Sequence, residues 1–295
     1  MNTIKLRLLL EQFFIEDIGE RDVTSELIFG NENRGSLVLI AKDEGIFCGE
    51  QIIHTGFRLL DENSQITLKV KDGEKVVKGQ ELALINGRVS ALLKAERVVL
   101  NLVQRMSGIA TKTNEAVKVL DSAKTRICDT RKTTPGLRML EKYAVRCGGG
   151  FNHRYGLYDA VMIKDNHISF AGSISNAVEA VRSNLGHMVK VEVEIETKDQ
   201  LLEAIDSEVD CIMFDNRPPE QIEEWIGNVP AGILTEASGG ITLDNLHSYR
   251  DCGVDYISLG FLTHSVKSLD ISAKVMAETK GAVAYEYIGG ARSEI

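Results

Sequence analysis

The sequence lacks the residue patterns that mark disulfide-linked, zinc-binding and membrane-spanning proteins. Its five cysteines are far apart and form no CxxC pair, and its six histidines show no HxH or HExxH spacing. These absences argue against a disulfide framework and a zinc site, and they favour a reducing compartment, which we expect to be the cytoplasm. The chain also contains no apolar run of about 18 residues, so we expect no membrane-spanning helix.

Positive charge is scarce as well. Lys and Arg number 34 against 43 Asp and Glu, which leaves a net charge of −9. This balance argues against a general affinity for nucleic acid or anionic membranes, so neither is expected as a partner. One segment departs from it: "DTRKTTPGLRMLEKYAVRCGGGFNHR", from Asp129 to Arg154, holds six cations and only one acid after Asp129. We interpret this segment as a local device for binding a small polyanion.

The residues before about position 100 are typical of strands joined by tight turns. "GSLVLIAK", "QITLKVKDG" and "QELALINGRV" are rich in Ile, Leu and Val and are separated by Asp-Gly, Lys-Gly and Asn-Gly. In "ITLKVK" apolar and polar residues alternate, which predicts a sheet with one wet face. From Ala91 to about Gly108 the apolar spacing predicts a helix that ends at Gly108. Arg97 lies on its polar face, and from the residues alone we interpret it as a surface ion-pair partner of Glu96.

After this helix, short apolar runs alternate with amphipathic helical stretches, which is typical of βαβ units in a parallel sheet or barrel. Polar residues at the carboxyl ends of the runs favour a barrel, and no GxGxxG indicates dinucleotide binding. The segment spans about 165 residues, fewer than the roughly 250 of eight-stranded barrels, so we expect six or seven strands. The runs begin 21 to 34 residues apart, at Ile127, Val161, Val191, Ile212, Ile233 and Tyr256.

The residues at these run ends suit the binding of several negative charges. The donors fit carboxylates and phosphates, and they are Arg131, Lys132, His153, Arg154 and Lys164. Glu194 and Asp215 form a carboxylate pair suited to oxygen-only coordination of Mg²⁺. The alternative for these two acids is a salt bridge to Lys132 or Lys164.

Three glycine-containing loops remain open to two interpretations. "EASGG" from Glu236 to Gly240, "SLGFLTHS" from Ser258 to Ser265 and "CGGGFN" from Cys147 to Asn152 could cradle phosphate with main-chain N–H groups. Glycines after strands are also ordinary turn residues or sites of close backbone approach. Cys147 lies in the basic segment, where a thiolate would be favoured, but we expect it to be a small buried apolar residue.

A series of motifs resembles the quinolinate phosphoribosyltransferase family, also called carboxylating nicotinate-nucleotide pyrophosphorylases. The motifs occur in the family's order and cover the chain to about Ile271. They are "ERVVLNLVQRMSGIAT", "DTRKTTPGLRMLEKYAVRCGGGFNHR", "GLYDAVMIKDNH", "VEVE", "FDN", "EASGGI" and "GVDYISLGFLTHS". The resemblance implies an open-faced α/β sandwich domain over residues 1–108 and a reduced α/β barrel of the type II phosphoribosyltransferase kind over 109–270. Residues 271–295 are a C-terminal segment that is partly tail, and the tail is given no function.

The resemblance also implies the activity. The family joins quinolinate to 5-phosphoribosyl-1-pyrophosphate (PRPP) with Mg²⁺ and releases CO₂, pyrophosphate and nicotinate mononucleotide, a transferase step of NAD biosynthesis. Quinolinate would be held by Arg131, His153, Arg154 and Lys164, with Arg97 reaching in from the other subunit of a homodimer, which could assemble into a hexamer. The catalytic set would be Lys132, Lys164, Glu194 and Asp215, the last two as metal ligands. PRPP would contact Thr130, Lys132, Glu194, Asp215, Ser238, Gly239, Gly240, Leu259, Gly260, Phe261 and His264.

One departure from the family, one basic helix face and two rival functions complete the interpretation. Phe261 stands where the family usually has a small residue, so we expect a narrower pocket there. Arg138, Lys142 and Arg146 are spaced four apart and are expected to form one face of a helix that supports the site or the subunit contact. One rival is a relative that acts on another heterocycle, including molybdenum-transport-associated relatives. The other is a lipoyl or biotinyl carrier, suggested by "VKDGEKVVKGQELALI", although no modifiable lysine context is present.

Overall fold

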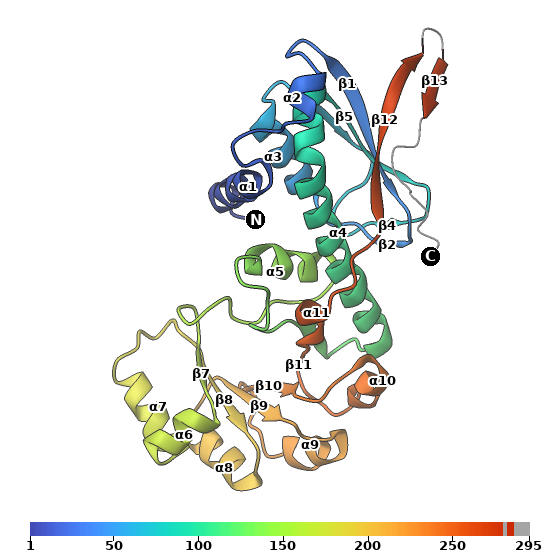
Figure 1. The fold of residues 1–295 in the computed structure, drawn as a ribbon. Helices are drawn as coiled ribbons and strands as arrows, with labels where there is room; N and C mark the ends of the chain where they lie inside the picture. Colours follow the sequence, from blue (N-terminus) through green and yellow to red (C-terminus); the bar gives the residue numbers. More distant parts are fainter. Residues whose placement is uncertain (280–281, 286–295) are drawn as a thin grey trace, which may run out of the picture. The chain divides into compact units, whose positions relative to one another are not determined.

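A computed structural model describes residues 1–279 and 282–285 (Figure 1). The chain divides into two compact units. The first combines Met1–Thr111 with Val266–Ile295, and the second is Lys112–Ser265. The expectation of a functionless tail concerns residues that lie largely outside the described ones.

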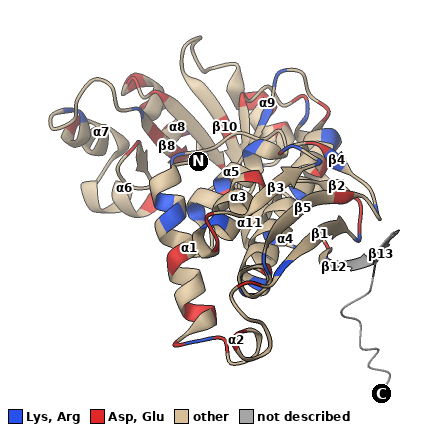
Figure 2. Cartoon of the chain, turned by 90° about the horizontal axis from the view of Figure 1, so that it is seen from above, with Lys and Arg blue, Asp and Glu red and all other residues tan. Residues whose placement is uncertain are grey.

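Charged residues are interspersed along the described chain. Figure 2 shows blue Lys and Arg positions and red Asp and Glu positions on helices, strands and loops of both units. Among those same residues, no helix is both long enough and apolar enough to span a bilayer.

The first unit contains a five-stranded antiparallel sheet with helices α1 and α3 on one side of it (Figure 1). In β3, Ile66 and Leu68 are half-buried while Gln65 and Thr67 are exposed, which confirms the expected sheet with one wet face. The strand order is β13(Ala282–Tyr285), β12(Ile271–Thr279), β1(Arg34–Ala41), β5(Glu81–Arg88) and β3(Gln65–Leu68). The other elements are α1(Thr3–Ile18), α2(Ser25–Ile28), β2(Gly45–Ile46), α3(Glu50–Leu60), β4(Lys75–Val76) and α4(Val89–Leu120).

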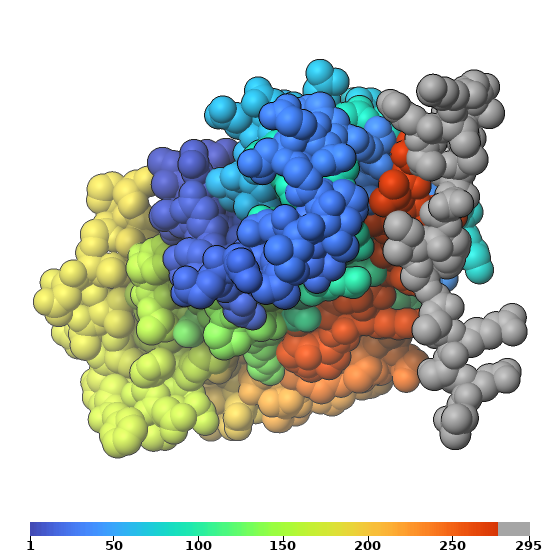
Figure 3. All heavy atoms as spheres, turned by 45° about the horizontal axis from the view of Figure 1, so that its top comes forward, coloured from blue at the N-terminus to red at the C-terminus, as the bar shows by residue number. Residues whose placement is uncertain are grey.

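Strand β12 brings the end of the described chain back to its beginning. It pairs antiparallel with β1 over six residue pairs, from Ser36↔Met276 to Ala41↔Ile271. In Figure 3 the orange-red residues of β12 accordingly lie against blue residues of the N-terminal region. The sheet of the first unit is therefore built from two segments that are separated in sequence by the whole second unit.

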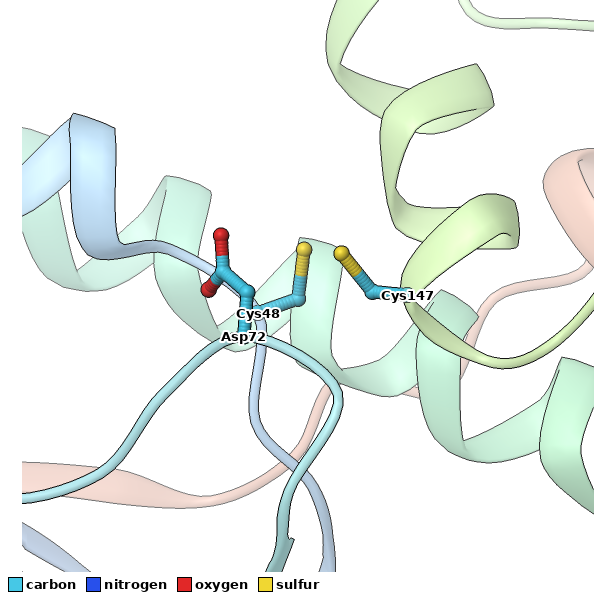
Figure 4. A group of neighbouring side chains, drawn as sticks. All are labelled: Cys48, Asp72 and Cys147. Atoms are coloured by element: carbon cyan, nitrogen blue, oxygen red, sulfur yellow. The ribbon is translucent and has the colours of Figure 1, made fainter.

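The turn before β4 caps helix α3. The Asp72 carboxylate accepts hydrogen bonds from the main-chain N–H groups of Gly49 (2.6 Å) and Glu50 (3.1 Å). Figure 4 shows this side chain beside Cys48, at the start of the helix. A carboxylate at a helix N-terminus satisfies unpaired N–H groups and interacts favourably with the helix dipole.

The predicted helix end at Gly108 is wrong, because α4 continues through Gly108 to Leu120. A Cβ atom at position 108 would clash with the carbonyl oxygen of Lys267 and lie 2.9 Å from the Cα of Ser268. Glycine is therefore required here so that the returning main chain can pass close to the helix, and not because the helix stops.

Gly108→Ala is expected to destabilise the protein by about 1–3 kcal/mol, the usual cost of overpacking. Thermal unfolding followed by circular dichroism would measure the loss. Gly227→Ala is the matched control, since nothing lies within 4 Å of the added Cβ at that position. Equal melting temperatures for the two variants would contradict the close approach of the main chain.

The second unit contains a six-stranded parallel sheet, which confirms the expected α/β class with a reduced barrel. All six apolar runs identified in the sequence are strands. Their order is β6(Arg126–Cys128), β11(Tyr256–Ser258), β10(Leu234–Ser238), β9(Cys211–Asp215), β8(Val191–Ile195) and β7(Val161–Ile163). The helices are α5(Arg138–Cys147), α6(Asp165–Ala171), α7(Ile174–Arg182), α8(Lys198–Asp206), α9(Pro219–Ile226), α10(Leu243–Leu246) and α11(Phe261–His264), with a 3₁₀ turn at His247–Tyr249.

A seventh strand position is occupied by a single residue. Phe151 forms an isolated parallel bridge with Cys128 of β6. Its N–H donates to the Ile127 carbonyl (2.8 Å) and its carbonyl accepts from the Asp129 N–H (3.1 Å). The sheet thus extends beyond β6 by one strand-like segment, which delivers His153 and Arg154 to the same end as the other strand termini.

Candidate active site

A pocket of about 400 Å³ opens at the carboxyl ends of the parallel strands of the second unit. This is the end at which α/β barrels build their sites. Most predicted site residues line it: Thr130, Arg131, Lys132, His153, Arg154, Lys164, Glu194, Asp215, Ser238, Gly239 and Gly240. Four further residues that were not among the predicted site residues also line it: Met162, Met213, Asn216 and Ser258.

Asp129, at the end of β6, ties the two functional parts of the basic segment together. It forms an ion pair with Lys142 in which both side chains are fully buried. The same carboxylate accepts hydrogen bonds from the side-chain amide of Asn152 (2.6 Å) and the main-chain N–H of His153 (2.9 Å). Residues 130–132 on one side and 153–154 on the other are therefore held by one buried anion.

The other cations of α5 support the loops around this anchor. Arg138 donates to the carbonyl of Tyr155 (2.9 Å) and to the Thr133 hydroxyl (3.0 Å). Arg146 donates to the Gly150 carbonyl (3.1 Å), and its guanidinium lies 4.7 Å from the ring centre of Phe151. Together with Lys142 these residues stabilise the segment, so about half of its positive charge is structural.

Arg131 and Arg154 supply the unpaired donors of the pocket. Their Nε atoms are buried and have no hydrogen-bond partner among residues 1–279 and 282–285. Burial lowers the pKa of the Arg154 guanidinium, and the positive charge of Arg131 lowers it further. Two guanidinium groups in one pocket, each with a buried Nε that no described residue engages, favour an anionic ligand.

Lys164 and Glu194 form an ion pair in this arrangement, with 2.7 Å between Nζ and Oε1. This confirms the simpler of the two interpretations of Glu194. Burial raises the pKa of Glu194, Lys164 lowers it and the charge of Asp215 raises it again, with a net rise. Glu194 and Asp215 stand on the neighbouring strands β8 and β9, so the two carboxylates could share a cation.

The Ser238–Gly240 loop needs glycine at position 239. Gly239 has a φ of +84°, and an added Cβ would clash with the side-chain oxygen of Asn216 and lie 2.9 Å from its main-chain nitrogen. The Asn216 N–H donates to the Ser238 carbonyl (2.8 Å), while its side-chain amide donates to Asp215 (2.8 Å). The loop after β10 is thereby fixed against the end of β9, with Ser238 facing the pocket.

The loop after β11 lies beside Lys132. A Cβ at Gly260 would be 3.0 Å from Cδ of Lys132 and 3.2 Å from Cδ2 of His264. The Thr263 hydroxyl donates to the Lys132 carbonyl (2.8 Å). Leu259 is buried and Phe261 is half-buried, and neither they nor Gly260 and His264 are among the residues that line the pocket.

Beneath the pocket lies a polar cluster that the sequence analysis missed. Nε2 of His153 is 2.8 Å from Glu192 and 3.8 Å from Glu236, and both acids are buried. Burial and the charge of Glu192 raise the pKa of Glu236 to about 8. The sequence does contain a signal for this cluster, the two-residue spacing of Glu192 and Glu194. Because strand side chains alternate, Glu192 lies on the same face of the strand as Glu194, one layer deeper.

Glu236 is expected to make stability fall as pH rises from about 4.5 to about 8. In this range the folded state keeps a proton that the unfolded chain releases, so the slope is at most about −1.4 kcal/mol per pH unit. Urea unfolding at pH 6 and pH 8 should show the decline in wild type and a flatter response in Glu236→Gln. An unchanged slope in the variant would mean that Glu236 is already ionised in the folded state.

Two residues that the sequence analysis considered, Arg97 and Cys147, do not line the pocket. Arg97 is exposed on α4 in the first unit, so its role remains a prediction. Cys147 is half-buried at the carboxyl end of α5 (Figure 4) and does not line the pocket.

The fold and the pocket define an α/β-barrel protein that holds a polyanionic small molecule at the carboxyl ends of its strands. Comparison with family models narrows this class: quinolinate phosphoribosyl transferase, N-terminal domain, matches residues 22–107, and quinolinate phosphoribosyl transferase, C-terminal domain, matches residues 109–274. The chain belongs to the quinolinate phosphoribosyltransferase family.

Individual relatives match along nearly the whole chain. A probable nicotinate-nucleotide pyrophosphorylase (carboxylating) of Bacillus subtilis (strain 168) is 60% identical over 275 residues, which cover 93% of this chain and 95% of that protein. Quinolinate phosphoribosyltransferase (decarboxylating) 1 of Nicotiana glauca is 39% identical and covers 94% of this chain and 84% of its own length. The crystal structure of NadC from Streptococcus pyogenes superposes with a TM-score of 0.90 at 37% identity, covering 97% of this chain and 99% of that one.

Proposed function

We propose that the pocket at the carboxyl ends of the barrel strands is the active site for the reaction of this family. As a member of the family, the chain transfers the phosphoribosyl group of PRPP to quinolinate with decarboxylation, and it yields nicotinate mononucleotide, CO₂ and pyrophosphate for NAD biosynthesis. The observation that carries the placement is the pair of buried, unpartnered Nε donors of Arg131 and Arg154 in one pocket.

Quinolinate is placed at the basic side of the pocket. Its two carboxylates match the guanidinium groups of Arg131 and Arg154, with Lys164 and His153 beside them. The side chains of Met162 and Met213 give the pocket an apolar floor against which a pyridine ring can pack. Arg97 is assigned to the neighbouring site in a homodimer, which can assemble further into a hexamer.

PRPP is placed at the opposite side, along Thr130 and Lys132, the Ser238–Gly240 loop and the loop from Leu259 through Gly260 and Phe261 to His264. Glu194 and Asp215 would hold Mg²⁺. They fit this ion because both are oxygen ligands at adjacent strand ends, and a cation between them would relieve the charge that raises the pKa of Glu194. When bound, Mg²⁺ supplies charge neutralisation of the pyrophosphate leaving group.

The chemistry then needs mainly positioning and electrostatics. Departure of pyrophosphate from C1 of the ribose builds positive charge on the sugar, which the carboxylates of Glu194 and Asp215 stabilise, and negative charge on the leaving group, which Lys132 stabilises. Lys164 completes the catalytic set by holding Glu194 in place. Decarboxylation requires no general base, because the positive charge of the quaternised ring nitrogen stabilises the electron pair that CO₂ leaves on the neighbouring carbon, and this carbon then takes a proton from water.

The domain bounds and the cellular location are assigned as the family resemblance implies. Residues 1–108 are assigned to a sandwich domain, whose sheet strand β12 completes, and residues 109–270 to the catalytic barrel. The enzyme is assigned to the cytoplasm, without nucleic-acid or membrane partners. The five cysteines are all free, as a reducing compartment would require.

A direct assay tests the proposal. Purified protein with PRPP and Mg²⁺ should consume quinolinate and release pyrophosphate, and activity should disappear with EDTA. Asp215→Asn should weaken one ligand of the metal ion. It should therefore raise the Mg²⁺ concentration needed for half-maximal rate by about tenfold or more. Consumption of PRPP with nicotinate but not with quinolinate would overturn the substrate assignment, and an unchanged Mg²⁺ requirement would overturn the metal site.

A further inference from the structure

Two carboxylates below the pocket contact His153 without any part in the proposed reaction. Glu192 and Glu236 are only 7% and 4% exposed. The distance from His153 Nε2 to Glu192 Oε2 is 2.8 Å, which is that of a hydrogen bond, whereas the 3.8 Å to Glu236 Oε2 is too long for one. Glu192 is therefore the partner of the ring at Nε2.

The other ring nitrogen is engaged as well. Nδ1 of His153 accepts a hydrogen bond from the main-chain N–H of Arg154 at 2.8 Å. An imidazole nitrogen that accepts a hydrogen bond carries no proton, so the proton sits on Nε2 and is donated to Glu192. By accepting that proton's hydrogen bond, Glu192 selects the tautomer that leaves Nδ1 available to Arg154.

Arg154 is thereby restrained at both ends. Its main-chain N–H is held by His153, and its Nη1 donates to the Ala160 carbonyl at 2.9 Å. Its buried Nε has no partner within the described residues, and the side chain lines the pocket. The Nε donor is thus left for a ligand in the pocket, on a side chain that is already held in place, which is the preorganisation that tight anion binding requires.

We propose that Glu192 is a positioning residue for phosphoribosyl transfer, which acts through His153 to hold the Arg154 guanidinium where it binds a carboxylate of quinolinate. The proposal rests on the placement of quinolinate under "Proposed function". It gives His153 a specific part there: the ring lines the pocket and orients Arg154, because both of its nitrogens are engaged by the protein.

Protonation of His153 would work against this arrangement. Burial lowers the pKa of His153, whereas the hydrogen bond with Glu192 and the charges of Glu236 and Glu192 raise it, with a net rise. A second proton would have to sit on Nδ1 and break the hydrogen bond from Arg154. The proposal therefore depends on which nitrogen carries the proton in the neutral His153 ring, and this can be measured.

Steady-state kinetics of two variants test the role of Glu192. Glu192→Leu removes the acceptor, and we expect the KM for quinolinate to rise about tenfold while the KM for PRPP stays within about twofold, as for loss of one hydrogen bond that orders the site. Glu192→Gln keeps an oxygen that accepts from Nε2–H, so its quinolinate KM should return to within about threefold of wild type. An unchanged quinolinate KM in Glu192→Leu, an equal rise in both KM values, or no rescue by glutamine would overturn the proposal.

Glu236→Gln is the matched control. It changes a second buried acid in the same barrel, but one that is not hydrogen-bonded to His153. Its quinolinate KM should stay within about twofold of wild type. A rise as large as in Glu192→Leu would assign the effect to general disturbance of the barrel interior and overturn the specific role.

Nitrogen NMR of the wild-type protein gives a test that does not depend on the kinetics of a variant. The His153 signals, identified by their loss in His153→Gln, should show a protonated Nε2 and an unprotonated Nδ1 at pH 9, where the ring is neutral despite its raised pKa. A protonated Nδ1 would overturn the proposal. Arg131→Ala in the same kinetic assay distinguishes failure of the proposed quinolinate site from failure of the role of Glu192. An unchanged quinolinate KM in Arg131→Ala refutes the proposed site. A raised quinolinate KM in Arg131→Ala, together with an unchanged one in Glu192→Leu, refutes only the role of Glu192.

Discussion

Replacing Arg131 with alanine is expected to raise the KM for quinolinate by about a hundredfold or more. The guanidinium lies in the pocket with a buried Nε that has no partner in the described part of the chain, so a bound carboxylate would be its main counter-ion. Removing one partner of a desolvated, hydrogen-bonded charge pair costs about 2–5 kcal/mol. The KM for PRPP should change far less, because PRPP is placed on Thr130, Lys132 and the loops after β10 and β11, and not on the Arg131 guanidinium. Initial rates at varied quinolinate and saturating PRPP measure the effect.

Arg126→Ala is the matched control for this experiment. Arg126 stands at the other end of the same strand, β6, and its guanidinium packs over the Phe151 ring at 4.7 Å. Its loss removes equal charge from the barrel without touching the pocket. If both variants shifted the quinolinate KM equally, the effect would come from overall charge, and the assignment of Arg131 would fail.

Lys142→Met is expected to destabilise the second unit by about 3–5 kcal/mol. The substitution leaves the Asp129 carboxylate fully buried without its cation, and breaking a buried ion pair from one side has a cost of this size. Trp225, the only tryptophan in the sequence, is buried in α9 of the second unit, so its fluorescence in urea reports the unfolding of this unit. A loss below about 1 kcal/mol would place the pair in a more polar environment than its burial indicates.

The double variant Asp129→Asn/Lys142→Met separates charge from packing. It removes both charges while keeping the side-chain volumes similar, so it should be more stable than Lys142→Met alone. The introduced asparagine would still offer a side-chain carbonyl oxygen to the His153 N–H. A double variant whose loss equals the sum of the two single losses would show that no coupling exists between the two side chains.

Strand positions in the barrel could be predicted because each run is a short apolar segment with polar residues at its end. The runs beginning at Ile127, Val161 and Val191 all became strands, and polar residues at their ends line one pocket. This works because parallel strands put their carboxyl ends on one side of the sheet. The roles of individual site residues, in contrast, rest on resemblance and await the experiments above.

The pocket floor was not predicted, although it follows from strand periodicity. Met162, Glu192, Met213 and Glu236 each precede a predicted site residue by two positions and therefore point into the same interior. The prediction considered only the residues at the strand ends, and not the inward-facing residues two positions before them. The prediction that the helix ends at Gly108 failed for a different reason. Glycine is needed there because a distant part of the main chain passes close to the helix, and the local spacing of apolar residues gives no information about such a tertiary contact.

During synthesis on the ribosome, β1 emerges long before its partner β12. The strands of the second unit come from one continuous stretch, so its sheet can close while the first unit still lacks a central neighbour. Until residues 271–276 leave the exit tunnel, the β1 edge presents unpaired N–H and C=O groups that could pair with another nascent chain. The unit that begins first is therefore completed last, and nascent chains paused before Ile271 are the species most in need of a chaperone.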